Sequence, residues 1–217
     1  NFRCRLGFGF LRYFCMNKIQ LTGIGIPRKF TGHFLLKNCP CSKRCRSAFD
    51  RFLKQSTKES FSRGLYVYGK KGTGKTCLGT FMLKWVICAG KSAQYMTHDY
   101  LVDFAFSERR TDFEKELLAA DVTMIDNIDR PSVKGEGYYP VLQRGMQIRA
   151  DAGLATVLVC DMTVNEFADR FGESAGNLLK RFYFCLCTEA SSQTGFEYQD
   201  TTESGSSDKT ERREGEL

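Results

Sequence analysis

The chain has 217 residues, of which 42% are hydrophobic, and its formal net charge is +7. This composition suffices for an ordinary hydrophobic core and excludes an intrinsically disordered protein, and no apolar run approaches the roughly 20 residues of a membrane span. The charge is uneven, since residues 1–75 hold 17 Lys/Arg against 2 Asp/Glu, residues 76–188 hold 12 against 15, and residues 189–217 hold 3 against 8.

Residues 1–60 are expected to form a basic, cysteine-containing region with weak periodicity. Its charge is typical of a protein that contacts a polyanion, with nucleic acid the leading candidate, although a solvated arm has the same composition. The side chains of His33, Cys39, Cys41 and Cys45 could bind zinc. Their spacing is not that of a standard zinc knuckle, so free thiols in a basic turn are favoured.

Residues 69–76 read GKKGTGKT, which matches the phosphate-binding pattern G-x-x-x-x-G-K-[ST] at every defined position. A β-favouring run precedes the first glycine and a helical pattern follows. In this context the backbone N–H groups of the loop surround the phosphates of ATP, and the helix N-terminus adds a favourable dipole. Lys75 would reach the β- and γ-phosphates, and the Thr76 hydroxyl would ligate Mg²⁺. The other residues expected to contact the nucleotide are Gly69, Lys70, Lys71, Gly72, Thr73, Gly74 and Cys77.

Strand-like and helix-like segments alternate between residues 61 and 188. Strands are expected at 65–69, 93–97, 122–126, 155–160 and 182–187, and helices at 75–88, 100–106, 113–119, 138–150 and after the capping box Thr163–Glu166. The alternation predicts an α/β fold of three layers, a parallel sheet with helices on both faces. The phosphate loop would lie at the carboxyl end of the first strand, where such sheets bind ligands.

Two smaller expectations concern the helices. Asp99 follows His98 at a helix start and is the expected cap. Four phenylalanines at helical spacings are expected in the core rather than as stacking platforms for bases, namely Phe104, Phe106, Phe167 and Phe171.

Asp126 ends the third expected strand, 51 residues after Lys75, and is the candidate acid that organises Mg²⁺. Many P-loop ATPases place next a glutamate that polarises the attacking water, but this chain has Asn127. A carboxamide can hold a water but cannot accept a proton. Asp129 is acidic, yet on a strand or tight turn it is expected to point elsewhere. The sequence therefore predicts tight nucleotide binding with slow turnover.

The ten cysteines would suggest disulfides in a small secreted chain, but the phosphate loop favours a reducing, cytoplasmic compartment. Five of them fall in apolar segments and are expected to behave as small core residues, namely Cys77, Cys88, Cys160, Cys185 and Cys187. Residues 1–15 are broken by arginines and make a poor signal peptide, and Met16 could be the true start. The tail, residues 189–217, has almost nothing to bury and is predicted to be disordered.

With GLYVYGKKGTGKT, DVTMIDNID, IRADAGLATVLVCDMTVNEF and FGESAGNLLKRF in this order, the chain resembles the AAA+ helicase loaders of bacteria, the DnaC/DnaI proteins, and the related IstB transposition ATPases. The resemblance runs from about Gly23, in a GIGIPRKF lead-in, to about Phe184. It implies an AAA+ domain over residues 61–188 that binds ATP and Mg²⁺. It also implies single-stranded DNA and a replicative helicase, or a transposase, as partners.

The resemblance implies roles for two further residues. The family has an asparagine after the fourth strand that senses the γ-phosphate, and Asp161 takes that place. An aspartate there would be repelled by the γ-phosphate unless it were protonated or metal-bound. The family's arginine that reaches into a neighbouring subunit's site corresponds to Arg181, which implies an active oligomer. A surface arginine that closes a helix is the alternative for Arg181.

Three functions remain open from the sequence. The first is a helicase loader of DNA replication, and the second is a transposition helper ATPase with the same motifs. The third is a non-hydrolysing, nucleotide-gated interaction protein, which Asn127 and Asp161 favour. The partner, the subunit number and any DNA sequence preference stay undetermined.

Overall fold

The computed structural model of the chain describes residues 18–31, 43–55, 62–107, 112–129 and 139–188. The expectations for the opening segment and for the tail from residue 189 lie outside the described residues. The same holds for the zinc candidates His33, Cys39 and Cys41 and for the side chain of Cys45.

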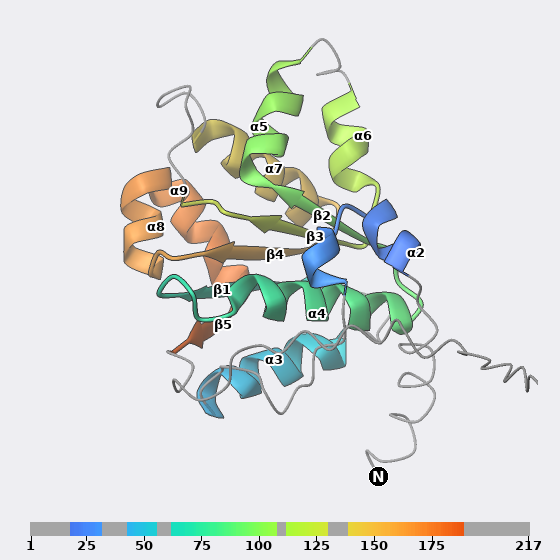
Figure 1. Ribbon diagram of the computed structural model, residues 1–217. Helices are drawn as coiled ribbons and strands as arrows, with labels where there is room; N and C mark the ends of the chain where they lie inside the picture. The colour runs from blue at the N-terminus through green and yellow to red at the C-terminus, as the bar shows by residue number, and fades with distance from the viewer. Residues whose placement is uncertain (1–17, 32–42, 56–61, 108–111, 130–138, 189–217) are drawn as a thin grey trace, which may run out of the picture.

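Five parallel strands form one sheet in the order β2-β3-β4-β1-β5 (Figure 1). Their bounds are β1 Gly64–Gly69, β2 Ala93–Thr97, β3 Val122–Asp126, β4 Ala155–Cys160 and β5 Phe182–Cys187. Strands β3 and β4 are buried at every residue, which explains why most of their residues are apolar. The expected strands agree with these bounds to within one residue.

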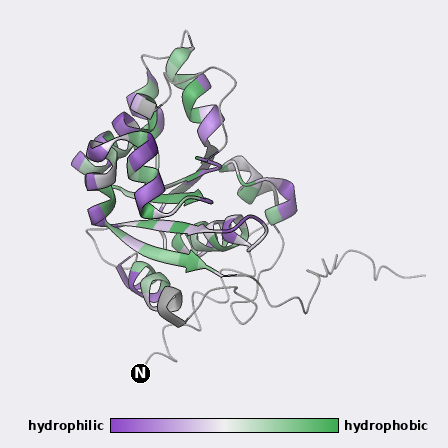
Figure 2. Cartoon of the chain, turned by 90° about the vertical axis from the view of Figure 1, so that its left-hand side faces the viewer, coloured by the Kyte–Doolittle hydropathy of each residue, from purple (hydrophilic) through white to green (hydrophobic). Residues whose placement is uncertain are grey.

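Helices cover both faces of the sheet (Figure 1). One face carries α2 Lys18–Gly23, the 3₁₀ turn η1 Arg28–Phe30, α3 Lys43–Gln55 and α4 Lys75–Cys88. The other carries α5 His98–Phe106, α6 Phe113–Leu118, α7 Tyr139–Asp151, α8 Val164–Phe171, α9 Glu173–Leu178 and η5 Leu179–Arg181. The strands are mostly hydrophobic, whereas the helices also carry hydrophilic residues (Figure 2). The predicted three-layer α/β fold is confirmed.

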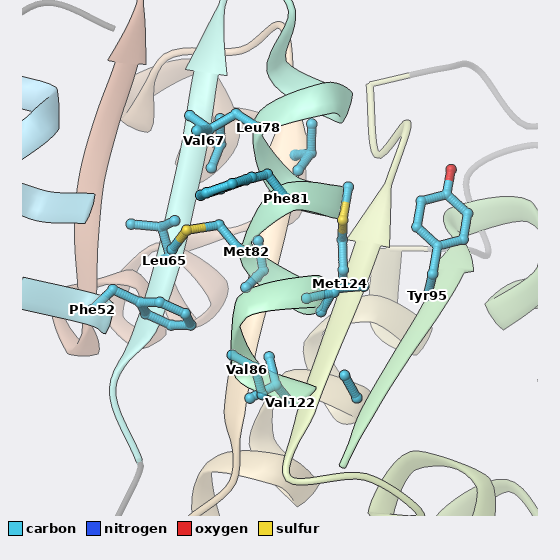
Figure 3. Packing of buried hydrophobic residues seen from close by; sticks show 14 of the residues in the cluster. Phe52, Leu65, Val67, Leu78, Phe81, Met82, Val86, Tyr95, Val122 and Met124 are labelled. Carbon is cyan, nitrogen blue, oxygen red and sulfur yellow. The ribbon is translucent and has the colours of Figure 1, made fainter. Parts of the chain in front are cut away.

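Helix α4 is buried nearly all round, and its Leu78, Met82 and Val86 pack in the hydrophobic core (Figure 3). Its Phe81 stacks on Phe49 of α3 with ring centroids 5.9 Å apart. On another side, Lys84 is buried, and its ammonium donates to the carbonyl of Phe30 at 2.6 Å. Trp85 of the same helix is half-buried. The phosphate loop is therefore followed by a helix that neighbouring elements fix in place.

The segment that precedes β1 belongs to the same core, which its weak periodicity did not predict. Phe49 and Phe52 of α3 and Ile26 after α2 are at most 2% exposed and join the cluster around α4. The carbonyl of Ile24 accepts from the backbone N–H of Tyr95 at 2.8 Å, so this segment also pairs with the outer edge of β2. The boundary expected at residue 60 does not coincide with a break in the packing.

Arg149 of α7 is fully buried in the other helical layer. Its guanidinium donates to the hydroxyl of Thr156 and to the carbonyls of Leu117, Ala120, Asp121 and Ala155. All of these acceptors are neutral, and burial lowers the pKa of Arg149 to about 10. One side chain thus ties α7 to the segment that enters β3 and to the start of β4.

Two expectations about α5 are wrong. The hydroxyl of Thr97 accepts from the backbone N–H of Tyr100 at 3.2 Å, so Thr97 is the cap and Asp99 is not. Phe106 is 63% exposed, although it was expected in the core; the other three phenylalanines of that group are buried. The cap differs because α5 begins two residues earlier than the sequence suggested. In the last turn of α5, Phe104 is buried and Phe106 is exposed.

Among the five cysteines that the sequence placed in apolar segments, Cys77 is half-buried and the other four are buried. The expected placement in the core is thus confirmed for four of them and not for Cys77; all five are free thiols. Within the described ranges, no helix is both long enough and apolar enough to cross a membrane.

Candidate phosphate-binding site

The predicted phosphate loop connects β1 to α4 at the carboxyl edge of the sheet. Gly69 has φ 142°, and a Cβ at this position would collide with the carbonyl of Cys187 on β5. Gly74 has φ 80° and is the N-cap of α4, where its carbonyl accepts from the backbone N–H of Leu78 at 3.0 Å. Both conformations favour glycine, so the motif's glycines are required by the backbone itself.

The loop is closed by Thr73, which is buried. Its hydroxyl donates to the carbonyl of Lys70 at 2.8 Å. Lys70, Lys71 and Gly72 are exposed, and Cys77 on the first turn of α4 is half-buried, with burial raising the pKa of its thiol. The loop therefore presents an open, positively charged outer side.

Lys75 is 7% exposed, and its ammonium points into the loop. It donates to the carbonyls of Gly69 at 2.8 Å and Lys70 at 2.7 Å, and it lies 2.5 Å from Oδ1 of Asp161. An ammonium has three N–H donors, so these three oxygens account for all of them. Sequence reasoning identified Lys75 and Asp161 but did not foresee that they pair.

Asp126 ends β3 and is only 2% exposed. Its Oδ1 accepts from the Thr76 hydroxyl at 3.4 Å and from the backbone N–H of Asn127 at 2.9 Å, and its Oδ2 accepts from the Tyr95 hydroxyl at 2.9 Å. Burial raises the pKa of the Asp126 carboxyl, and the three hydrogen bonds act against that rise. Thr76 and Asp126 thus present neighbouring oxygens of the kind that Mg²⁺ prefers, which fits the predicted metal role.

Tyr95 was missed by sequence reasoning. It lies on β2, which pairs with β3 so that Thr97 is opposite Asp126. An aromatic residue in an apolar strand suggests core packing, and Tyr95 is indeed 8% exposed. Its role as the anchor of Asp126 depends on the strand order, which the sequence did not reveal.

Asn127 follows Asp126 and is half-buried. Its φ is 60°, the left-handed region that residues other than glycine rarely adopt, and asparagine tolerates it best. The carbonyl of Asp129, two residues later, accepts from Arg170 of α8 at 3.0 Å. This hydrogen bond therefore ties the turn after β3 to helix α8.

Arg181 lies away from these residues. It precedes β5, whose first residue, Phe182, pairs with Gly64 at the start of β1, whereas the loop follows Gly69 at the other end. Five residues along a strand span roughly 17 Å. The exposed Arg181 therefore lies at the opposite edge of the sheet from the phosphate loop of its own chain.

The structure thus brings together most of the expected site residues, namely Gly69 to Thr76, Asp126, Asn127 and Asp161. It leaves Arg181 apart. Among the described residues, no group of three or more His, Cys, Asp or Glu side chains could hold a metal ion.

No family profile and no curated protein matches the sequence. Solved structures match the fold. A structure of DnaI has a TM-score of 0.61 at 18% identity, over 75% of this chain and 95% of that one. A DnaC helicase loader has a TM-score of 0.58 at 15% identity, over 68% of this chain and 92% of that one.

The replication initiator DnaA, bound to AMPPCP and single-stranded DNA, has a TM-score of 0.58 at 16% identity, over 71% of this chain and 49% of that one. The chain thus spans about half the length of this initiator and nearly the whole of the DnaI and DnaC structures. At such identities the likeness establishes the fold. The chain therefore shares its fold with the DnaI, DnaC and DnaA structures.

Proposed function

We propose that the chain is an ATP-binding protein of DNA replication, similar in role to a helicase loader. It uses ATP and Mg²⁺ to control the assembly of a replicative helicase on single-stranded DNA in the cytoplasm, and it hydrolyses ATP slowly. The observation that carries this proposal is the convergence of Lys75, Thr76 and Asp126 on a loop of the required shape. Support for the replication role comes from a fold that a helicase loader and an initiator share.

Each of these residues has a specific task in nucleotide binding. The N–H groups at the start of α4 face the phosphates, and the helix dipole favours their negative charge. Lys75 neutralises phosphate charge from a buried position. Thr76 and Asp126 would hold Mg²⁺ and its waters, and bound Mg²⁺ would offset the negative charge of the phosphate oxygens.

Slow hydrolysis follows from the residue that comes after Asp126. A glutamate at this position accepts a proton from the attacking water, whereas the carboxamide of Asn127 cannot. Asp129 is the nearest later acid, and its backbone carbonyl is bonded to Arg170, which limits how the turn can rearrange. The site therefore favours long-lived nucleotide complexes, as suits a binding switch.

Self-association through Arg181 is part of the proposal. Because Arg181 and the phosphate loop lie at opposite edges of one sheet, this arginine could contact phosphate only in a neighbouring copy. Such a head-to-tail contact generates a ring or a helical filament. The basic excess of residues 1–75 supplies the charge for contacts with DNA phosphates.

Steady-state turnover of ATP with Mg²⁺, with and without single-stranded DNA, tests this function. The native chain should turn over at about one cycle per minute or less, and DNA should stimulate it. Arg181→Ala should bind ATP normally but lose the turnover. Arg144→Ala removes an exposed arginine on α7 and should behave as native.

Three results would count against the proposal. If ATP does not bind, nucleotide binding itself is wrong. If Arg181→Ala and Arg144→Ala have the same activity, the role of Arg181 is wrong. If ATP binds but no turnover occurs even with DNA, the non-hydrolysing interaction protein is the better description, and Asn127 and Asp161 are the observations that favour it.

A further inference from the structure

The ion pair between Lys75 and Asp161 places a carboxylate inside the predicted phosphate site. Nζ of Lys75 and Oδ1 of Asp161 are 2.5 Å apart, and the two side chains are 8% and 38% exposed. The other two donors of the ammonium are taken by the carbonyls of Gly69 and Lys70. Asp161 is thus the only anionic group bonded to Lys75 among the described residues.

The backbone on both sides of Asp161 is held in place. Cys160, which ends β4, pairs with Tyr68 of β1, the residue before the loop begins. The carbonyl of Met162 accepts from the buried Tyr66 hydroxyl at 2.9 Å, which ties the next residue back to β1. Thr163 then caps α8 through a capping box. The carboxylate of Asp161 therefore stays near Lys75 unless its side chain alone rotates away.

This arrangement affects the two classes of nucleotide differently. A diphosphate can bind the N–H groups of the loop. It can also accept from Lys75 in place of one of the two backbone carbonyls, so the ion pair between Lys75 and Asp161 can persist. A triphosphate brings a further phosphate to the same ammonium. That phosphate must displace the Asp161 carboxylate and remain close to its negative charge.

We infer that Asp161 makes this site selective for nucleoside diphosphates over nucleoside triphosphates. The inference rests on the proposed nucleotide binding and adds its specificity: ADP is the resting ligand, and arrival of a γ-phosphate breaks the Lys75–Asp161 pair. Asp161 acts as a specificity-determining residue, because a neutral side chain of the same shape would hydrogen-bond a phosphate without repelling it.

Calorimetric titration with ADP and with AMPPCP, both with Mg²⁺, tests the inference on the full chain. The native protein should bind ADP at least about tenfold more tightly than AMPPCP. In Asp161→Asn this ratio should fall at least about fivefold, mainly through tighter binding of AMPPCP. The matched control is Asp151→Asn, because Asp151 is exposed and precedes β4 at the opposite edge of the sheet. In this control the ratio of the ADP affinity to the AMPPCP affinity should equal that of the native chain.

The outcomes separate this inference from the proposed function. Equal affinities for ADP and AMPPCP in the native chain, or an unchanged ratio in Asp161→Asn, would overturn the diphosphate selectivity but leave nucleotide binding intact. Failure of the native chain to bind either ligand would overturn both. If Asp161→Asn does not fold, as judged by circular dichroism, Asp161→Ala should show the same fall in the ratio, and a native ratio there would refute the selectivity.

Discussion

Asn127 occupies the position where many P-loop ATPases carry the glutamate that polarises water, and its backbone has a φ of 60°. The two facts are connected, because asparagine tolerates the left-handed region better than glutamate does. Its N–H also donates to Asp126, so the conformation helps to orient the acid that would organise Mg²⁺. The replacement of glutamate by Asn127 therefore affects both the backbone conformation of the turn and the proposed hydrolysis of ATP.

Substitution of Asn127 should test this link. We expect Asn127→Glu to lower the free energy of unfolding by about 1 kcal/mol, because it forces a side chain with poor left-handed propensity into that region. Asn127→Gly, which has no such cost, should stay close to the native value. Urea denaturation followed by circular dichroism measures both. Equal stabilities for the glutamate and glycine variants would show that this backbone conformation is not maintained.

Lys84 should make stability depend on pH. Burial lowers the pKa of Lys84 to about 8 from its usual value of 10.5. Between these two values the unfolded chain binds the proton that the folded chain has released, so stability rises with pH. We expect the native chain to gain about 3 kcal/mol relative to Lys84→Met between pH 7.5 and 10.5.

Denaturation of both proteins across this pH range gives the difference in the free energy of unfolding, in which the titrating groups that do not interact with Lys84 cancel. Cys77 interacts with Lys84, so both proteins carry Cys77→Ser. Lys180→Met removes an exposed lysine and should show no such trend. The difference in the free energy of unfolding between the native chain and Lys84→Met should therefore change with pH. A difference that stays constant, or that changes in the opposite direction, would contradict the lowered pKa of Lys84.

At the scale of elements, the strands were predictable, whereas the helices α2, α3 and α9 were not. The strands are short, mostly apolar runs rich in β-branched and aromatic residues. The central strands β3 and β4 are buried throughout, whereas the edge strand β5 leaves Phe184 and Leu186 exposed. Helix α3 was missed because Ala48, Phe49, Phe52 and Leu53 form a narrow stripe among basic residues. Their spacing is helical and was the available signal. The apolar residues of α3 pack against the sheet and against α4, and this packing could not be read from the sequence.

Arg149 is the clearest determinant of stability at this scale. We expect Arg149→Met to lower the free energy of unfolding by about 3 kcal/mol or more, because it leaves several buried carbonyls and one hydroxyl without a donor. Arg144→Met on the same helix removes an exposed side chain and should change stability by less than about 0.5 kcal/mol. Chemical denaturation compares the two. Similar losses in both variants would mean that the buried hydrogen bonds contribute little.

At the scale of the whole molecule, the sheet separates two groups of candidate site residues. The phosphate loop, Asp126 and Asp161 lie at its carboxyl edge, and Arg181 lies at its amino edge. The loop was predictable because one contiguous motif encodes it. The anchoring of Asp126 by Tyr95 and the pairing of Lys75 with Asp161 were not, because both depend on strand order and register.

Mixing two inactive variants should reveal contacts between copies. Lys75→Ala lacks the phosphate lysine, and Arg181→Ala lacks the arginine at the other edge, so each alone should show no turnover. In a mixture, a Lys75→Ala chain can supply Arg181 to the intact site of an Arg181→Ala chain, and part of the native turnover should return. No recovery at any mixing ratio would argue against action of Arg181 between copies.

Equilibrium titration with ATP and Mg²⁺ tests nucleotide binding at the phosphate loop most directly. The native chain should bind ATP at a single site, and Lys75→Ala should bind it at least about 100-fold more weakly, because a buried charge-assisted contact is lost. Lys70→Ala, which removes an exposed lysine from the same loop, should lose far less. No binding by the native chain, or equal affinity in the native chain and Lys75→Ala, would contradict the assignment of the site.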